Sequence, residues 1–387
     1  MVATITTPRI MLIGGGAVGE IADVMARLGC CKPLLVTDPF MRDSGKVAHV
    51  TDVLESAGIT WGLFADTVPE PTDDIVIIGT EIINNGDFDC VIALGGGSPI
   101  DTAKAMTILA RGGGMIQDYK VPHQANQPGL PIIAIPTTAG TGSEVTKVTV
   151  ITDKSSDEKM LIMGLGCLPS AAIVDYELTY SVPYRTTADT GLDSLTHAIE
   201  AYVSAKHNPF TDTLALSAMG LIARNIRSAC GEPDNTAARE AMMLAATQAG
   251  MAFSNASVCL VHGMSRPIGA FFHVAHGLSN AMLLPTITAF SATAAMARYA
   301  DCARAMGLAE QSIDAETAVN NLLAELRQLN KDLEVPSPKD YGIDEDKYFS
   351  LLTTMAEQAL ASGSPNNNPR VPSVQEMTML YTEAWAS

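Results

Sequence analysis

Apolar positions in roughly the first 135 residues form short runs that alternate with helical patterns. They predict strands at 9–13, 33–37, 90–94 and 131–135 and helices at 17–28 and 101–109. Strands that end in glycine-rich turns and lead into helices are typical of βαβ units, which build a parallel sheet with ligand sites at its carboxyl edge. The pattern therefore predicts an α/β domain in the first half of the chain.

Beyond Pro183 the pattern changes to long Ala-, Leu- and Met-rich segments with helical periodicity, at 189–204, 211–230, 237–253 and 292–306. We place the domain boundary there, with an α/β dinucleotide-binding domain at 1–183 and a helical metal-binding domain at 184–387. The stretch from Thr186 and Thr187 to Asp189 is expected to cap the first helix. A Ser-, Pro- and Asn-rich segment at 362–373 is expected to be a surface loop.

Composition narrows the class of protein. A chain of 387 residues with 47% hydrophobic and 17% charged residues is long enough for two well-packed domains. The net charge of −18 repels nucleic acid and anionic membrane surfaces, so neither is an expected partner. No targeting segment or membrane-spanning apolar run is evident, which predicts a cytoplasmic protein. The seven cysteines form no CxxC pair and are expected to be reduced and mostly buried.

Two glycine-rich turns are candidates for binding phosphate. The segment 14–19 (GGGAVG) fits the GxGxxG pattern between a predicted strand and a predicted helix. The segment 95–101 (GGGSPID) occupies the same context, with Ser98 as the expected helix cap and Pro99 at the first helical position. Free backbone N–H groups at such a helix start bind pyrophosphate. Each turn also fits a plain strand-to-helix connection without a ligand.

The segment 136–146 (PTTAGTGSEVT) follows the strand predicted at 131–135 and carries five hydroxyl side chains among small residues. Short hydroxyl donors of this kind suit contact with a ribose or a nicotinamide amide. A Thr- and Gly-rich loop without a ligand is the alternative.

A carboxylate and three imidazoles suggest a metal site. Asp193 and His197 are four residues apart and would lie on one helix face. His262 and His276 follow in apolar stretches, where an unpartnered imidazole would be costly. One Asp and three His form a mixed nitrogen and oxygen site that suits Fe(II), Zn(II) or a similar ion. Each histidine alone fits a hydrogen-bonded core residue better, but the set favours a metal.

These segments, in this order, resemble the iron-dependent, or group III, alcohol dehydrogenases. The matching pieces are GGGSPID, PTTAGTGSEVT, DSLTHAIEAY from Asp193 and HGMSRPIGAFFHVAHGLSNAMLLP from His262. The resemblance covers nearly the whole chain and implies a dehydroquinate synthase-like architecture, with a parallel-sheet dinucleotide-binding domain, an all-α domain and the metal between them. It also implies that the metal ligands are Asp193, His197, His262 and His276.

The resemblance further implies a cofactor site. It assigns the pyrophosphate to Gly96, Gly97, Ser98 and Asp101, the ribose and nicotinamide to Thr137, Thr138, Thr141 and Ser143, and the rest of the pocket to Lys159 and Leu178. In this family the turn at 14–19 matters less for phosphate than the second turn. Asp38, at the end of the second predicted strand, would bind the adenosine ribose hydroxyls and repel a 2′-phosphate, which predicts NAD over NADP.

The chain departs from many relatives four residues after His262, where they have a histidine discussed as a proton relay and this chain has Arg266. Arginine stays protonated and cannot act as a general base. We expect another route for the proton, with His273 as a candidate. Arg266 itself is interpreted either as half of a structural salt bridge or as a clamp for an anionic substrate group.

The sequence thus predicts an NAD- and metal-dependent oxidoreductase for small alcohols and aldehydes, including primary alcohols, diols and hydroxy acids. Alternatives are a hydroxyacid–oxoacid transhydrogenase, a glycerol-type dehydrogenase, a metal-free reductase, a sugar-phosphate cyclising lyase, and a non-catalytic dinucleotide-binding sensor or filament subunit. Low charge density favours a homo-oligomer, and relatives are commonly dimeric or larger.

Overall fold

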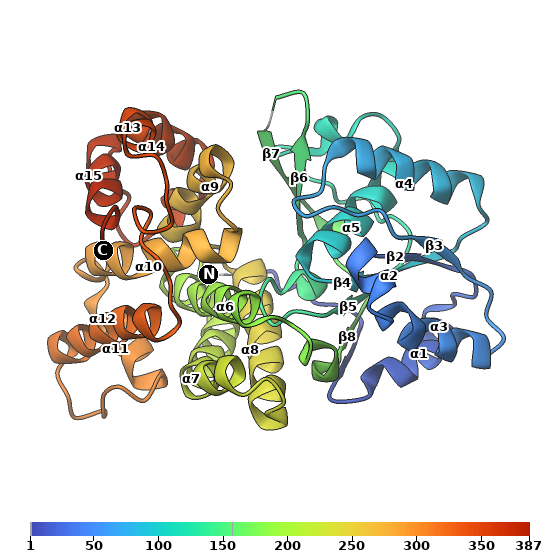
Figure 1. Ribbon diagram of the computed structural model, residues 1–387, viewed down its shortest axis with the longest axis horizontal. Helices are drawn as coiled ribbons and strands as arrows, with labels where there is room; N and C mark the ends of the chain where they lie inside the picture. The colour runs from blue at the N-terminus through green and yellow to red at the C-terminus, as the bar shows by residue number, and fades with distance from the viewer. Residues whose placement is uncertain (1, 157) are drawn as a thin grey trace. The chain divides into compact units, whose positions relative to one another are not determined.

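The computed structural model describes residues 2–156 and 158–387, and the chain separates into two compact units (Figure 1). One unit comprises Thr6–Val182, and the other comprises Pro183–Ser387 together with residues 2–5. The division falls at a proline, one residue before the start predicted for the helical domain.

The first unit is built on a six-stranded parallel sheet in the order β1-β8-β5-β4-β2-β3. Its strands are β1 (Ile10–Ile13), β2 (Pro33–Val36), β3 (Gly62–Phe64), β4 (Cys90–Gly95), β5 (Ile132–Pro136) and β8 (Ala171–Val174). The register pairs Val36 with Ala93 and Gly95 with Pro136. The carboxyl ends of β2, β4 and β5 therefore meet along one edge.

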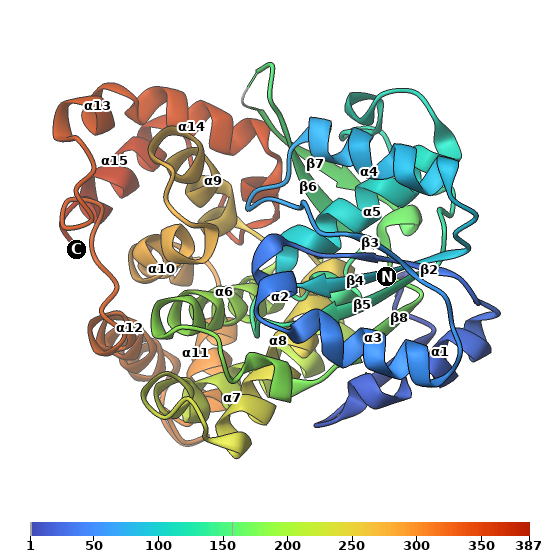
Figure 2. The same cartoon turned by 45° about the vertical axis from the view of Figure 1, so that its right-hand side comes forward.

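Helices cover both faces of this sheet (Figure 2). Helices α1 (Ile21–Leu28) and α3 (Lys46–Ser56) pack on the face that includes Ile92 and Leu94. Helices α4 (Asp73–Asn85) and α5 (Gly97–Gly112) pack on the face of Val91 and Ala93, where they meet the antiparallel pair β6 (Val148–Asp153) and β7 (Glu158–Met163). Alternate residues of β4 thus enter two different cores, which explains its unbroken apolar run.

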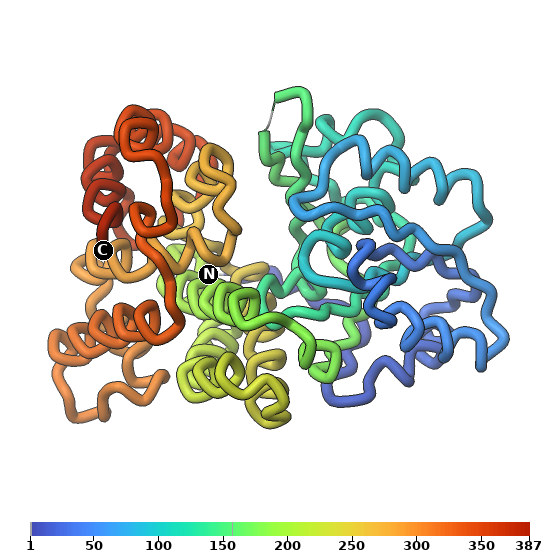
Figure 3. Tube along the Cα trace, viewed as in Figure 1, coloured from blue at the N-terminus to red at the C-terminus, as the bar shows by residue number. Residues whose placement is uncertain are grey.

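The second unit is helical, and Figure 3 traces it from green at α6 to red at the C-terminus. Helix α6 (Tyr184–Val203) is largely buried, and the side chains from Leu192 to Val203 are all buried. The other helices are α7 (Pro209–Gly231), α8 (Thr236–Asn255), α9 (Leu260–Phe272), α10 (His276–Ala292), α11 (Met296–Ala305), α12 (Ala315–Asp332), α13 (Glu345–Ser350), α14 (Leu352–Ala361) and α15 (Val374–Ala384).

The α/β and all-α architecture predicted from the sequence is confirmed, with local differences. Residues 17–20, expected as helix, form a short 3₁₀ turn before α1. Helix α6 begins at Tyr184, directly after Pro183, so the predicted cap at Thr186 to Asp189 is wrong. The predicted helix 292–306 is divided between the end of α10 and α11.

Burial differs from the expectation in the segment 362–373 but agrees with it for the cysteines. The segment 362–373 is not simply a surface loop, because it contains a 3₁₀ turn, η6 (Ser364–Asn367), in which Ser364 and Asn367 are buried. All seven cysteines are free and six are buried, as expected. Within 2–156 and 158–387, no single helix meets the length and hydropathy required to cross a membrane, and α8 and α9 do so only as a pair bent by 103°.

Candidate functional site

Four side chains from three helices converge in the helical unit. Asp193 and His197 come from α6, His262 from α9 and His276 from α10, and one ligand atom from each lies within 4.8 Å of all the others. The Nε2 atoms of His197, His262 and His276 lie 3.9, 3.5 and 3.8 Å from Asp193 Oδ1. The structure therefore brings together all four predicted ligands.

Local packing explains this convergence. Asp193 and His197 occupy neighbouring turns of α6 on one face. A Cβ added to Gly277 would lie 2.5 Å from the carbonyl oxygen of Asp189, so the first turn of α10 is pressed against the backbone of α6. This contact brings His276 beside Asp193. His276 is exposed whereas the other three ligands are buried, so the cluster is open on one side of the helical unit.

Glu200 orients one of the ligands. Its Oε2 atom lies 2.7 Å from Nδ1 of His262, so the other ring nitrogen faces Asp193. The N–H groups of Cys259 and Val261, at the start of α9, also donate to this carboxylate at 2.8 and 2.6 Å. Carboxylate partners of this kind fix the tautomer and orientation of metal-binding histidines. Glu200 was not predicted from the sequence, although an acid between apolar residues, three positions after His197, was the available signal.

The charges of the cluster stabilise one another. Burial alone would raise the pKa of Asp193, but the three neighbouring imidazoles hold it well below its usual range. Burial disfavours charge on His262, yet the carboxylates of Glu200 and Asp193 raise its pKa to about 9. The site thus stabilises positive charge at its centre.

Asn280, one turn after His276 on α10, lies in the centre of the cluster. Its Nδ2 atom is 2.7 Å from Asp193 Oδ1, 3.2 Å from His262 Nε2 and 3.3 Å from His276 Nε2. Its buried Oδ1 atom has no hydrogen-bond partner among the described residues. The amide N–H groups of Asn280 are therefore directed at the point where the ligand atoms converge. One carboxylate oxygen and three imidazole nitrogens form a set of ligand atoms that suits a divalent transition metal. The residues present therefore fit a metal ion.

A second cluster of potential ligands, Cys30, Asp89 and Cys90, lies in the α/β unit. Burial raises the pKa of both thiols, and Asp89 already accepts the N–H groups of Cys31 and Lys32. Metal binding requires thiolates. We therefore interpret this cluster as structural.

The second glycine-rich turn forms an open helix start at the carboxyl end of β4. Helix α5 begins at Gly97 with Gly96 as its N-cap, and no side chain caps it. The predicted cap at Ser98 is wrong, because Ser98 and Pro99 lie inside the first turn. Among the described residues, no side chain caps the first N–H groups of this 16-residue helix, and helix starts of this kind can bind phosphate.

The first glycine-rich turn is closed by the protein itself. The N–H of Val18 donates to the carboxylate of Asp175 at 3.1 Å, and a Cβ added to Gly15 would lie 2.7 Å from the hydroxyl oxygen of Tyr176. The turn leads into a 3₁₀ segment of four residues rather than directly into α1. The packing agrees with the expectation that this turn is the poorer phosphate site.

The threonine-rich segment adjoins the open helix start, because β4 and β5 are neighbours. A Cβ added to Gly97 would lie 2.9 Å from Cγ2 of Thr141, and one added to Gly96 would lie 3.4 Å from Oγ1 of Thr138. Thr137 is buried, and its hydroxyl has no hydrogen-bond partner among the described residues. Both predicted cofactor segments therefore lie on one edge of the sheet.

Two predicted cofactor residues are engaged inside the α/β unit. Ser143 donates to Asp101 Oδ1 at 2.6 Å, and the N–H of Val150 donates to Asp101 Oδ2 at 3.0 Å. Buried Lys104, which was not predicted from the sequence, donates to Ser143 at 2.8 Å. Asp101 and Ser143 thus hold the segment after β5 against α5.

The remaining predicted cofactor residues lie apart from one another. Lys159 on β7 pairs with Glu70 at 2.5 Å. Leu178 follows β8, and its carbonyl oxygen accepts a hydrogen bond from Lys46 at 2.9 Å. Asp38 follows β2, where its Oδ1 accepts the N–H of Met41 at the start of the short helix α2 (Pro39–Asp43).

Of the two candidate catalytic residues, Arg266 lies on α9 and His273 directly follows it. Arg266 lies one turn after His262, is partly buried and donates to the hydroxyl of Ser364 at 3.1 Å. No carboxylate of the described chain lies within ion-pair distance of Arg266, so the structural salt bridge expected as one interpretation is not formed. His273 ends α9 in a left-handed conformation (φ 55°) and is exposed.

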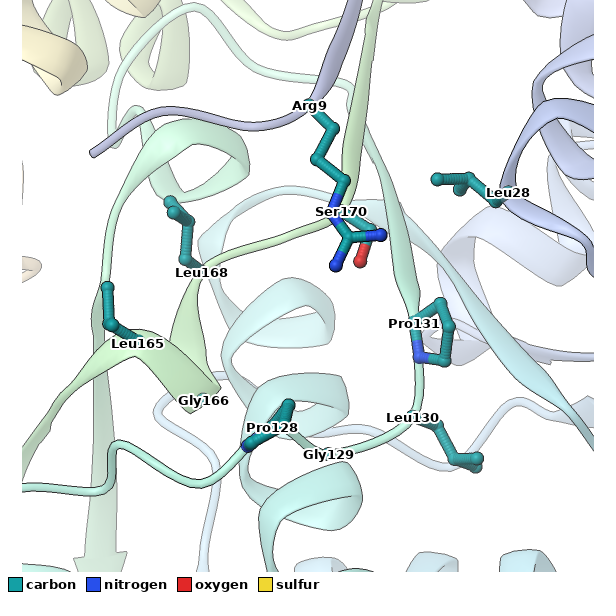
Figure 4. A pocket seen from close by; sticks show the side chains of 10 residues that line it. All are labelled: Arg9, Leu28, Pro128, Gly129, Leu130, Pro131, Leu165, Gly166, Leu168 and Ser170. Atoms are coloured by element: carbon teal, nitrogen blue, oxygen red, sulfur yellow. The ribbon is translucent and has the colours of Figure 1, made fainter.

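A pocket in the α/β unit lies at the opposite edge of the sheet (Figure 4). Its lining includes Arg9, Pro131 and Ser170, which directly precede β1, β5 and β8. Because ligands of parallel sheets bind at the carboxyl ends of strands, this pocket is distinct from the candidate cofactor edge.

Comparisons with known proteins agree with this fold and site. Residues 8–176 match the family model of iron-containing alcohol dehydrogenase, and residues 187–385 match the C-terminal model of the same family. Lactaldehyde reductase of Escherichia coli (strain K12) is 37% identical over 96% of this chain and 97% of its own length.

Solved structures give the same result. A 1,3-propanediol oxidoreductase superposes with a TM-score of 0.95 at 35% identity, covering 99% of this chain and all of that one. Sulfoacetaldehyde reductase from Bifidobacterium kashiwanohense, solved in complex with NAD⁺, superposes with a TM-score of 0.90 at 31% identity over the full length of both chains. The fold and the ligand cluster define a metal-dependent oxidoreductase with a dinucleotide-binding domain. The chain belongs to the iron-containing alcohol dehydrogenase family.

Proposed function

We propose that the protein transfers hydride between NAD(H) and a small alcohol or aldehyde, with a divalent metal held by Asp193, His197, His262 and His276. The observation that carries this proposal is the convergence of these four ligand atoms within 4.8 Å. The named substrates of its relatives, lactaldehyde, 1,3-propanediol and sulfoacetaldehyde, support a short-chain carbonyl or alcohol substrate.

A divalent ion bound there supplies a Lewis acid for the substrate oxygen, and NAD supplies the hydride acceptor. Glu200 keeps His262 in the orientation that binds a metal. The open N–H groups at Gly97 and Ser98 bind the pyrophosphate, with Thr138 and Thr141 beside them. Asp38 binds the adenosine ribose through its second carboxylate oxygen. His273 takes the proton released from the alcohol. Iron is the ion in the family's description, and the same donor set also suits zinc.

The test is anaerobic metal reconstitution followed by NADH turnover on an aldehyde panel and NAD turnover on alcohols and hydroxy acids. Asp193→Ala and His262→Ala are expected to lose both bound metal and turnover. His207→Ala is the matched control, because His207 pairs with Asp212 outside the ligand cluster. Full turnover in the two ligand variants would refute the proposal. Turnover without free cofactor between a hydroxy acid and an oxo acid would identify a transhydrogenase instead.

We also propose that the enzyme is a cytoplasmic homo-oligomer, a dimer at least. Seven free cysteines suit a reducing compartment. Exposed Phe40, Ile77 and Ile78 offer apolar surface for self-association. Analytical ultracentrifugation tests the oligomeric state.

A further inference from the structure

Arg266, one turn after the ligand His262 on α9, carries a positive charge that forms no ion pair with a carboxylate of the described residues. Partly buried Arg298 and Arg304 elsewhere in the helical unit are paired with Asp212 and Asp301 at 2.7 and 3.0 Å. Arg266 makes no such pair with the described residues, and its side chain donates to the neutral hydroxyl of Ser364. A poorly solvated guanidinium without a carboxylate is costly unless an anion joins it.

Glu200, the acid that acts on Arg266 electrostatically, does not form an ion pair with it. Burial lowers the pKa of the guanidinium and Glu200 opposes this effect. Arginine side chains stay protonated in proteins at neutral pH. Glu200 lies beyond ion-pair distance, and its two oxygens already accept hydrogen bonds from Cys259, Val261 and His262. The carboxylates of Asp193 and Glu200 balance a divalent ion, so the charge of Arg266 is left over.

Arg266 lies close enough to the ligand His262 along α9 for its charge to act on a substrate bound at the metal site. Arg266 and His262 are four residues apart on one face of α9, which separates them by about 6 Å along the helix axis. The guanidinium keeps donors beyond the one given to Ser364 and can bind a carboxylate or sulfonate through two parallel hydrogen bonds. Ser364 supplies a neutral hydroxyl that fixes the side chain without cancelling its charge.

We infer that Arg266 makes this enzyme selective for short aldehydes and alcohols that carry an anionic oxygen group, a carboxylate or a sulfonate, at the end remote from the reacting carbon. This inference rests on the proposed function, because it names the substrate class of the same site. One helical turn between His262 and Arg266 matches a chain of about two to four carbons.

The first arm of the test compares kcat/KM for charged and neutral aldehydes with NADH. Charged substrates are 4-oxobutanoate and sulfoacetaldehyde, and the neutral partners are methyl 4-oxobutanoate and propanal. We expect the metal-loaded wild type to prefer the charged member of each pair. Arg266→Gln should lower the charged-to-neutral ratio by about tenfold to a hundredfold, and Arg266→Lys should retain only part of it, because lysine keeps the charge but cannot form the two parallel hydrogen bonds. The two charged substrates distinguish a carboxylate from a sulfonate.

Arg304→Gln is the control, because it removes an equal charge that Asp301 already neutralises. Melting temperature and bound metal per chain confirm that each variant is folded and loaded. A wild type without preference, or an Arg266→Gln variant with an unchanged ratio, would overturn the inference.

The second arm measures binding without turnover. Succinate, an unreactive dicarboxylate, is titrated calorimetrically into the NAD- and metal-loaded enzyme, and Arg266→Gln should weaken its binding by at least about tenfold. Equal binding by wild type and variant, or no binding by either, would count against the inference. Absence of turnover on every aldehyde would refute the proposed function, while succinate binding would still decide the role of Arg266.

Discussion

The imidazole of His262 is held by Glu200, seven residues beyond Asp193 on the same helix, through a 2.7 Å contact between Nδ1 and Oε2. One carboxylate thus orients a ligand from behind while also accepting the first N–H groups of α9. Helix α9 and the ligand it carries are positioned by the same side chain.

Glu200→Gln is expected to weaken metal binding by about 10- to 100-fold, since the neutral amide neither fixes the His262 tautomer as firmly nor raises its basicity. Competition with a chromophoric chelator measures the affinity. Glu325→Gln, which alters a carboxylate paired with Arg227 outside the cluster, is the control. An unchanged metal affinity in a folded Glu200→Gln variant would refute the role assigned to Glu200.

Removing the metal should lower the melting temperature of the protein. The four ligands join α6, α9 and α10, so an ion that binds only the folded state stabilises their packing. A free metal concentration of 100 times the dissociation constant adds about 2.7 kcal/mol to the free energy of unfolding. This corresponds to about 5–10 °C for a unit of this size. Calorimetry before and after chelation, with elemental analysis of both samples, measures the change, and equal melting temperatures would show that no ion links these helices.

Asp38→Asn should relax the preference for NAD over NADP. The amide keeps an oxygen that can accept the N–H of Met41, but it no longer repels a 2′-phosphate. Loss of a like-charge contact of this kind is expected to raise the NADP-to-NAD ratio of kcat/KM by at least about tenfold. Asp43→Asn, at the other end of α2, is the control. The assignment fails if both variants keep the wild-type ratio.

His273→Gln should lower kcat/KM for alcohol oxidation by about tenfold to a hundredfold, because the proton loses its proposed acceptor. Added imidazole should restore part of the loss, since His273 is exposed and small buffers can reach it. Steady-state kinetics with and without imidazole make the measurement. Wild-type rates in the variant would remove His273 from the proton route.

Cys31 should be the first thiol to react with an alkylating reagent, because the other six cysteines are buried. The hydrogen bond from its Sγ to Asp89, together with the negative charge of Asp89, raises the pKa of Cys31. A raised pKa leaves less thiolate at neutral pH, so Asp89→Asn should speed alkylation near pH 7.5, and the difference should shrink at high pH. Peptide mapping after timed labelling measures this, with Cys302 as the unreactive internal reference.

Much of the fold and of the ligand set follows from local sequence patterns. The buried apolar runs of β2, β4 and β5 are long enough to identify strands covered on both faces, and the spacing of Asp193 and His197 places both on one helix face. The role of Glu200 cannot be predicted from such local patterns. A single acid on a helix is usually solvated, and its role depends on where α9 begins, which only the tertiary packing determines.

Tertiary packing also explains why the segment at 362–373, predicted to be a surface loop, is partly buried. Its Ser-, Pro- and Asn-rich composition is typical of exposed loops. In the structure Pro365 fits against Gly263 on α9, where an added Cβ would lie 2.7 Å from the proline ring. This contact places Ser364 within reach of Arg266, a relationship that no pattern in either segment indicates.

The carboxylate of Asp175 that holds the N–H of Val18 has a consequence for how a nucleotide meets the sheet. The turn at 14–19 already binds a carboxylate of the protein, that of Asp175. Of the two glycine-rich turns, the one after β4 is therefore the one available to a phosphate group. We therefore expect a dinucleotide to place its phosphates at the start of α5, and the choice of turn to fix its orientation on the sheet.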